Sequence, residues 1–160
     1  KYQIKKTIEA IKKYRVQTLF ICPNNDAGST LILKEIKKNK NIFHAPTLTL
    51  SEYRSLLEKC FVLVGNSSSG IHEASSFLKP VINIGTRQNG RIRSKNIIDV
   101  SHDKTKILNA IRKIENPIFR NKLIKNLRNP YSLPNTSAKI LKVLKKINLD
   151  QKKLQKRITY

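Results

Sequence analysis

Short apolar runs rich in Val and Ile, each followed by a polar loop and then by a segment with helical spacing, restrict the fold of this chain most strongly. The clearest runs are residues 61–65 and 80–85, and shorter ones lie at 18–22, 41–45 and 97–100. Uniformly apolar strands that alternate with helices predict a parallel sheet covered by helices on both faces. No repeat or linker interrupts the pattern. We therefore expect one α/β domain over residues 1–160.

The segments between these runs have apolar residues at helical spacing. The first helix is predicted around Ile4, Ile8 and Ile11. The sequence predicts further helices at 29–38, from 51 onward, at 71–78, 103–115, 118–127 and 136–148.

A formal charge of +23, from 33 Lys and Arg against 10 Asp and Glu, raises the question of nucleic acid. Most of the basic residues are lysines that alternate with Ile and Leu, which places them on the solvent faces of amphipathic helices. A nucleic-acid site usually adds arginines and exposed aromatics in one patch, and only Tyr14-Arg15 resembles that. We expect no specific nucleic-acid partner. Weak, salt-sensitive binding of polyanions by a non-enzymatic basic domain is kept as an alternative.

Other features restrict the class of protein further. No apolar run reaches the ~20 residues that span a bilayer, so no membrane partner is expected. Cys22 and Cys60 cannot form a disulfide framework and favour free thiols in a reducing cytoplasm. No Cys/His cluster has metal-ligand spacing, and no metal site is predicted. The sequence contains no Met, and we expect it to be an excerpt of a longer protein.

Ligands of open parallel sheets bind beyond the carboxyl ends of the strands, where this sequence places unusual loops. Ser67, Ser68, Ser69 and Gly70 join a buried strand to a helix. Unpaired N–H groups at a helix start favour an anion, and hydroxyls beside a glycine let phosphate oxygens approach closely. The loop is neither a Walker loop nor a Gly-x-Gly-x-x-Gly loop. Phosphate binding and simple helix capping are equally compatible with it.

Two neighbouring features fit a nucleotide as well. Glu73 follows Ser69 by one helical turn and could accept hydrogen bonds from a ribose diol, although its spacing alone slightly favours a carboxylate that caps the helix dipole. Three arginines, Arg87, Arg91 and Arg93, lie in one loop flanked by glycines. Forked guanidinium groups suit diphosphate oxygens, and an exposed basic loop is the alternative.

Taken together, these motifs resemble one family, the hydrolysing UDP-N-acetylglucosamine 2-epimerases of sialic-acid and related nonulosonic-acid synthesis. The resemblance runs in order from about Leu19 to the C-terminus. It rests on residues 23–29 (PNNDAGS), 64–74 (VGNSSSGIHEA), 80–91 (PVINIGTRQNGR), 129–131 (NPY) and 153–159 (KLQKRIT). One departure is Ser132-Leu133-Pro134, where the family usually has a glycine-containing stretch, so the turn there is expected to differ.

The resemblance implies a Rossmann-like, three-layer lobe, the C-terminal lobe of a two-lobe enzyme of the glycosyltransferase-B type. The N-terminal lobe is absent from this sequence, and the C-terminal helices from about 118 to 160 would pack back on it. Within the lobe, Ser67 and Ser68 would bind the diphosphate of UDP, together with Ser69 and Gly70, and Glu73 the ribose. The remaining UDP-binding assignments are Asn24 near the nucleotide, Tyr53 on the uracil, backbone near Leu48 at the base edge, Arg87 at the phosphates or sugar, and Gln88 and Arg91 as further candidates.

The resemblance also implies the reaction. UDP is eliminated from UDP-N-acetylglucosamine, and water then adds to the 2-acetamidoglucal to give free N-acetylmannosamine. The proton-transferring carboxylates would lie on the missing lobe, so the fragment alone is expected to be inactive. Arg87 is the one candidate contributor to catalysis in this lobe, and His72 is expected to be a surface histidine. No cofactor is expected for this redox-neutral chemistry, and the whole enzyme is expected to be a homo-oligomer. The alternatives are a UDP-2,4-diacetamido sugar as substrate, or a nucleotide-sugar lobe of a glycosyltransferase.

Overall fold

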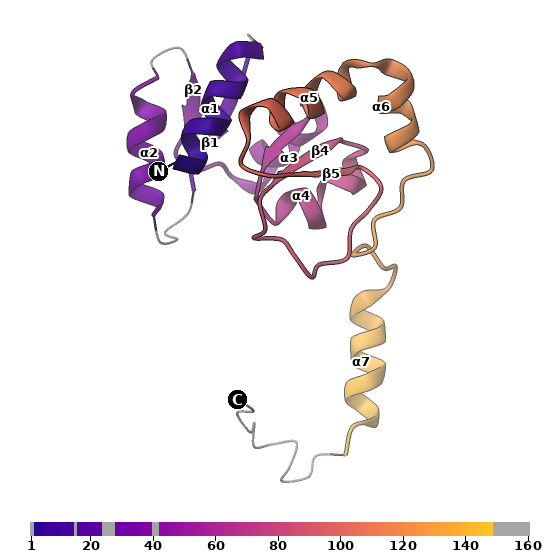
Figure 1. The fold of residues 1–160 in the computed structure, drawn as a ribbon. Coiled ribbons are helices and arrows are strands. Elements are labelled where there is room, and N and C mark those ends of the chain that lie inside the picture. Colours follow the sequence, from indigo (N-terminus) through magenta and orange to yellow (C-terminus); the bar gives the residue numbers. More distant parts are fainter. Residues whose placement is uncertain (1, 15, 24–27, 40–41, 149–160) are drawn as a thin grey trace.

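The computed structural model describes residues 2–14, 16–23, 28–39 and 42–148, and Figure 1 shows their arrangement. Helices and strands alternate along most of this part of the chain. In order they are α1 (Tyr2–Tyr14), β1 (Leu19–Ile21), α2 (Ser29–Lys37), β2 (Phe43–Ala45), α3 (Leu50–Lys59), β3 (Leu63–Gly65), α4 (Ser69–His72), the 3₁₀ turn η1 (Ala74–Phe77), β4 (Val81–Ile84), β5 (Ile97–Val100), α5 (Lys104–Glu115), α6 (Pro117–Ile124) and α7 (Thr136–Lys146).

All strand pairs within the described residues are parallel, as the apolar runs predicted. They form two ladders, β1–β2 and β3–β4–β5, rather than one hydrogen-bonded sheet. The strands have only three or four residues each, and the β3–β4–β5 ladder carries the centre of the domain. Parallel order places the carboxyl ends of β3, β4 and β5 at one edge, so the loops after Gly65, Ile84 and Val100 are neighbours.

Helices cover both faces of β4, which is buried at every residue. Ile82 and Ile84 pack into a cluster with Ala10 of α1 and Ile107 of α5. On the other face, Val81 packs against Leu57 of α3 and Ala74 of η1, together with Tyr53 and Leu63. Alternate residues of a strand point to opposite faces, and here Ile82 and Ile84 on one face and Val81 on the other meet apolar partners. The three-layer α/β prediction is therefore confirmed.

The segment after the serine loop differs from the single helix predicted at 71–78. It consists of one α-helical turn, α4, and the separate 3₁₀ turn η1. Ser75 and Ser76 are poor helix formers, because serine side chains compete for backbone hydrogen bonds. Leu78 then adopts a left-handed conformation, with φ of 53°. A helix this short provides little macrodipole, so an anion there would depend on individual N–H and hydroxyl groups.

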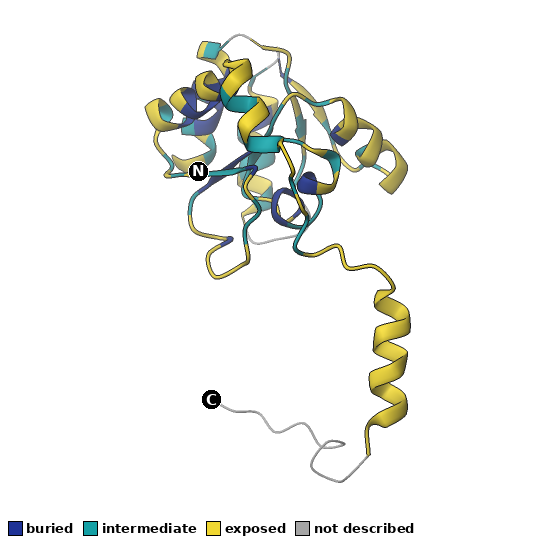
Figure 2. Ribbon diagram, turned by 90° about the vertical axis from the view of Figure 1, so that its right-hand side faces the viewer, coloured by how far each residue is buried: buried dark blue, intermediate teal, exposed yellow. Residues whose placement is uncertain are grey.

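Helix α7 stands apart from the body of the domain in Figure 1. None of its residues is buried, and Figure 2 shows it exposed all round. Its apolar residues Ile140, Leu141, Val143 and Leu144 are each more than half exposed. Its lysines alternate with them, as expected for an amphipathic helix that has an unpartnered face.

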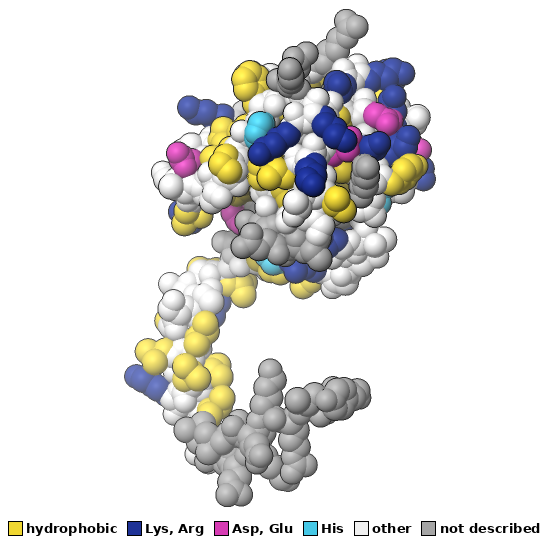
Figure 3. Space-filling model, turned by 90° about the vertical axis from the view of Figure 1, so that its left-hand side faces the viewer, with side chains coloured by type: hydrophobic (Ala, Val, Ile, Leu, Met, Phe, Trp, Pro, Cys, Tyr) yellow, Lys and Arg dark blue, Asp and Glu magenta, His cyan; other side chains and the backbone are white. Residues whose placement is uncertain are grey.

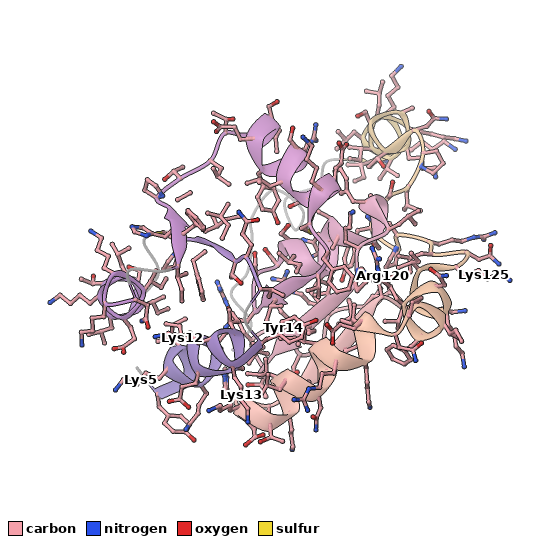
Figure 4. All side chains as sticks on the ribbon, turned by 90° about the horizontal axis from the view of Figure 1, so that it is seen from above. Lys5, Lys12, Lys13, Tyr14, Arg120 and Lys125 are labelled. Atoms are coloured by element: carbon pink, nitrogen blue, oxygen red, sulfur yellow. The ribbon has the colours of Figure 1, made fainter. Side chains whose placement is uncertain are left out.

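The basic residues are distributed over several elements. Figure 3 shows Lys and Arg side chains interspersed with apolar and acidic ones on one face of the molecule. In Figure 4, Lys5, Lys12 and Lys13 lie on α1, whereas Arg120 and Lys125 lie on and just after α6, at a separate place. Tyr14 at the end of α1 faces inward, where burial and the hydrogen bond and charge of Glu115 raise its pKa to about 12. Arg15, the other half of the Tyr14-Arg15 pair, lies outside the described residues.

The burial of β4 generates a stability prediction. Ile82→Ala should lower the free energy of unfolding by about 2–5 kcal/mol, because it leaves a cavity between α1, α5 and the sheet. Urea denaturation followed by circular dichroism measures the change. Ile118→Ala is the matched control, since Ile118 is 82% exposed and its loss should change stability by less than about 0.5 kcal/mol. Equal losses for the two variants would contradict this description of the core.

Candidate nucleotide-binding site

The serine loop, residues 66–70, follows the carboxyl end of β3, an outer strand of the β3–β4–β5 ladder, at the loop edge that the three strands share. Ser67 and Ser68 are exposed, whereas Ser69 and Gly70 are buried. A β-carbon on Gly70 would lie 2.9 Å from Cγ1 of Val81. The glycine therefore lets the loop pack directly against β4, which fixes its depth in the domain.

Hydrogen-bonding groups remain open on the exposed side of this loop. The N–H of Ser69 donates to Oγ of Ser67 over 3.3 Å, and the N–H groups of His72 and Glu73 complete the turn on Ser68 and Ser69. The N–H groups of Ser67 and Ser68 donate to none of the described residues. Two N–H groups and two hydroxyls at one exposed turn can bind the oxygens of a phosphate.

Tyr53 supports the serine loop through its hydroxyl. Its ring packs on the Leu57–Ala74–Val81 cluster, and its hydroxyl is hydrogen-bonded to the Ser69 hydroxyl. Burial raises the pKa of the Tyr53 phenol; the hydrogen bond with Ser69 opposes this, and the charge of Glu73 adds to it. The neutral phenol can therefore donate. The predicted stacking of Tyr53 on uracil stays a prediction.

Gln88 connects the arginine-bearing loop to the serine loop. It is only 2% exposed, and its Nε2 donates to the carbonyl oxygen of Asn66 over 2.7 Å. Its Oε1 is buried and has no partner within the described chain. The link brings residues 86–91 against residues 66–70, so the structure places the two predicted phosphate-binding loops together.

A second set of bonds fixes the far end of the arginine-bearing loop. Arg93 donates to Asp99 through Nε over 2.7 Å and through Nη2 over 3.3 Å. Buried Asn83 of β4 donates to the same carboxylate over 2.6 Å. Burial acts to raise the pKa of Asp99, but the hydrogen bonds from Arg93 and Asn83 outweigh it and hold the pKa below the ordinary range. Arg93 is thus engaged in structure rather than free for phosphate.

The remaining predicted residues are placed as follows. Glu73 is half-buried at the end of α4, and no described residue donates a hydrogen bond to its carboxylate. Leu48 lies between β2 and α3, just before the capping box of Thr49 and Glu52. Arg87 is exposed and has an interaction partner. Asn24 and residues 153–159 lie outside the described residues.

Three residues beside the site were not assigned a part in it from the sequence: His72, Asn129 and Tyr131. Arg91 Nη1 lies 3.0 Å from His72 Nε2, and the Tyr131 ring packs on the imidazole at 4.4 Å between centroids. Asn129 donates to the carbonyl oxygen of His72 over 2.8 Å. The signals in the sequence were the motif at 64–74 for His72 and the motif NPY at 129–131 for the other two, and neither indicated which residues would be in contact.

Comparisons with known proteins identify the family of the chain. The family model described as "UDP-N-acetylglucosamine 2-epimerase" matches residues 1–145. A "UDP-N,N'-diacetylbacillosamine 2-epimerase (hydrolyzing)" of Legionella pneumophila is 35% identical over 98% of this chain, and a GDP/UDP-N,N'-diacetylbacillosamine 2-epimerase (hydrolyzing) of Campylobacter jejuni is 36% identical over 92%. The chain spans about 40% of the length of these relatives, 41% and 40% respectively.

Solved structures show the same fold. The UDP-GlcNAc 2-epimerase of Methanocaldococcus jannaschii, in complex with UDP-GlcNAc and UDP, matches 90% of this chain at a TM-score of 0.68 and 18% identity, and the chain covers 41% of it. The enzyme of Neisseria meningitidis bound to UDP-GlcNAc matches 91% at 0.64 and 21% identity, again with 41% of its length covered. The protein is thus of the α/β class, with polar loops at the carboxyl edge of a parallel ladder. It belongs to the UDP-N-acetylglucosamine 2-epimerase family, as the motifs predicted.

Two further findings on the described residues bear on other classes of site. Within them, no helix is long and apolar enough to cross a membrane. The same part of the chain brings together no group of three His, Cys, Asp or Glu side chains that could hold a metal ion.

The Asp99 carboxylate leads to a pH-dependent prediction. A lowered pKa in the folded state means that the stabilisation is present above the unfolded-state pKa near ~3.9 and is lost as pH falls below it. Asp99→Asn should therefore be less stable than the unmodified chain at pH 6, and the difference should shrink as pH falls below about 4. Urea denaturation at pH 6, 4 and 3 measures both. A difference that stays constant with pH would contradict the assignment of this ion pair.

Proposed function

We propose that this chain is the UDP-binding, C-terminal lobe of a hydrolysing UDP-N-acetylglucosamine 2-epimerase. The observation that carries the proposal is the serine loop, whose open N–H groups and hydroxyls lie against an arginine-bearing loop tied to it by Gln88. This combination supplies neutral donors and cations at one sheet edge, which suits a diphosphate. Family membership supports the nucleotide.

In this proposal each part of UDP meets a separate part of the site. Ser67 and Ser68 bind the diphosphate, with Ser69 and Gly70 shaping the turn. Glu73 is half-buried and accepts no hydrogen bond from the described residues, which leaves its carboxylate for the ribose hydroxyls. Arg87 and Arg91 neutralise phosphate charge. Tyr53, Leu48 and Asn24 complete the nucleotide site.

In this proposal Gln88 does not contact UDP but holds the arginine-bearing loop in place. A side chain that is only 2% exposed, with its amide already donating to Asn66, is suited to holding the loop rather than to reaching a ligand.

The proposed reaction proceeds by elimination and then hydration. The C2 proton of the sugar is removed and the C1–O bond to UDP breaks, which gives the 2-acetamidoglucal. Water then adds across the double bond, with a proton returning to C2 and hydroxyl to C1, to give N-acetylmannosamine. The donors of this lobe stabilise the charge that develops on the departing diphosphate. The acids and bases that move the C2 proton belong to the rest of the enzyme.

A second substrate has a specific observation in its favour. The Legionella pneumophila and Campylobacter jejuni relatives, which match more than nine tenths of this chain, are both named as diacetylbacillosamine 2-epimerases. The Neisseria meningitidis UDP-N-acetylglucosamine 2-epimerase, 37% identical, matches 58%. A UDP-2,4-diacetamido sugar is therefore the second candidate. Parallel assays of the whole enzyme with the two UDP-sugars would distinguish them, because this lobe contacts the nucleotide that they share.

Helix α7 supports the division into lobes. An amphipathic helix whose apolar residues are more than half exposed leaves more apolar surface uncovered than is usual for a domain that works alone. We propose that α7 packs on the other lobe of the same enzyme.

The diphosphate assignment predicts a pattern of affinities. Ser68→Ala should weaken UDP about tenfold or more, because one charge-assisted hydrogen bond contributes ~1.5–3 kcal/mol, and leave uridine unchanged. Glu73→Gln is the matched control, and should weaken UDP and uridine alike because both contain the ribose. Isothermal titration calorimetry measures the affinities of the unmodified chain and of both variants for UDP and for uridine. Equal loss of UDP and uridine in Ser68→Ala would place Ser68 away from the phosphates.

The lobe assignment predicts binding without turnover. The 160-residue chain should bind UDP and release no N-acetylmannosamine from UDP-N-acetylglucosamine, since a positioned acid or base contributes ~10²–10⁴-fold. A chain that also contains the other lobe should turn over. A coupled assay for UDP with NMR of the sugar measures this. Turnover by the isolated chain at the full enzyme's rate would contradict the assignment. Failure to bind UDP, with tight salt-sensitive binding of heparin, would favour the polyanion-binding alternative.

A further inference from the structure

We infer that His72 is a positioning residue that aims the guanidinium of Arg91 at the diphosphate. The inference rests on the proposed UDP site and adds to it a specific role for a histidine that the sequence placed on a helix surface. It is carried by a side-chain cluster at the end of α4, formed by His72, Arg91, Asn129 and Tyr131.

The contact between His72 and Arg91 defines the state of the imidazole. Arg91 Nη1 and His72 Nε2 are 3.0 Å apart. A guanidinium has donors only, so Nε2 must be the acceptor and the ring must be neutral, with its proton on Nδ1. A nitrogen that already accepts from arginine is not free to take a proton from substrate. The geometry thus argues for positioning and against general-base catalysis by His72.

One ring packs on the imidazole, and the backbone of His72 is held separately. The Tyr131 ring packs on it at 4.4 Å and 52°, and the Tyr131 hydroxyl donates to the carbonyl oxygen of Ile92 over 3.2 Å. Asn129 donates to the His72 carbonyl oxygen over 2.8 Å and to the Ser76 hydroxyl over 2.7 Å. The backbone N–H of Tyr131 closes the turn on Asn129 over 2.9 Å. The NPY turn therefore clamps α4 and the arginine-bearing loop to each other.

The backbone of Arg91 is fixed as well. Its carbonyl oxygen accepts a hydrogen bond from Arg93 Nη1 over 3.0 Å, and Arg93 is paired with Asp99. Upstream, Gln88 ties the same loop to Asn66. With both the backbone and one guanidinium nitrogen held, Arg91 presents its other N–H groups from a defined place beside the serine loop. Preorganised donors of this kind bind an anion without first losing side-chain entropy.

Two substitutions at the same position separate positioning from packing. His72→Phe keeps an aromatic ring against Tyr131 and removes the acceptor. His72→Gln loses the ring and keeps an acceptor oxygen for Arg91. Positioning predicts that His72→Phe weakens UDP about three- to tenfold with uridine unchanged, and that His72→Gln stays closer to the unmodified chain. A role in packing alone predicts the reverse order.

A double-mutant cycle tests whether the effect acts through Arg91. Arg91→Ala should lower the affinity for UDP at least as much as His72→Phe does. The double variant should bind UDP as tightly as Arg91→Ala alone. Arg112→Ala is the matched control, because it removes an equal charge from the exposed face of α5. It should leave the affinity for UDP almost unchanged, since salt screens a distant exposed charge. Calorimetry with UDP and uridine measures the affinities of the unmodified chain and of every variant.

The outcomes separate this inference from the proposed function. If the unmodified chain binds UDP and His72→Phe binds it equally well, the inference is overturned while the UDP site stands. Additive losses in the double variant would also overturn it, because His72 would then act independently of Arg91. If the unmodified chain binds no UDP, the proposed function itself fails.

Discussion

The burial of β4 on both faces is the constraint on which the rest of the structure depends. Val81 and the isoleucines at 82 and 84 are each at most 3% exposed, and they can be buried only if helices cover the sheet above and below. Parallel pairing of β4 with β3 and β5 follows, since crossover helices are what bring such strands side by side. Because the three strands are parallel, their following loops emerge at one edge. The candidate site is a consequence of how this strand is buried.

At that edge, side chains rather than regular structure determine the geometry. The serine loop is followed by a single helical turn, and the arginine-bearing loop contains no strand or helix. Three polar residues of low exposure bring order: Gln88 reaches Asn66, Asn83 reaches Asp99, and Asn96 donates to the Lys79 carbonyl oxygen over 2.7 Å. Buried amides have to be hydrogen-bonded, so each of them selects one loop conformation. These hydrogen bonds explain how loops with so many polar residues can keep fixed conformations at this edge of the sheet.

The sequence predicted those features that local patterns encode. Short apolar runs located every strand of the described chain, and the Ser-rich and arginine-bearing loops were predicted at the ends of the correct strands. What failed was the helix at 71–78, where Ser75, Ser76 and the left-handed Leu78 break the turn. The contacts of Asn129 with His72 and of Arg91 with His72 span 57 and 19 residues, and no local pattern encodes such separations. Side-chain partners depend on how loops pack, which hydrophobic periodicity does not determine.

Net charge and preorganised donors have different effects on anion binding in this structure. A surface charge of +23 attracts any polyanion at low salt, but it cannot distinguish a nucleoside diphosphate from other anions. Selectivity has to come from donors held at fixed positions, and the largely exposed lysines of α1 and α7 are long, rotatable side chains that provide few of them. Arg91, in contrast, is held through its backbone by Arg93 and through its guanidinium by His72. An arginine held in this way loses little entropy on binding. In the proposed site, this single fixed cation beside the serine loop would therefore contribute more to selectivity for a diphosphate than the many rotatable lysines.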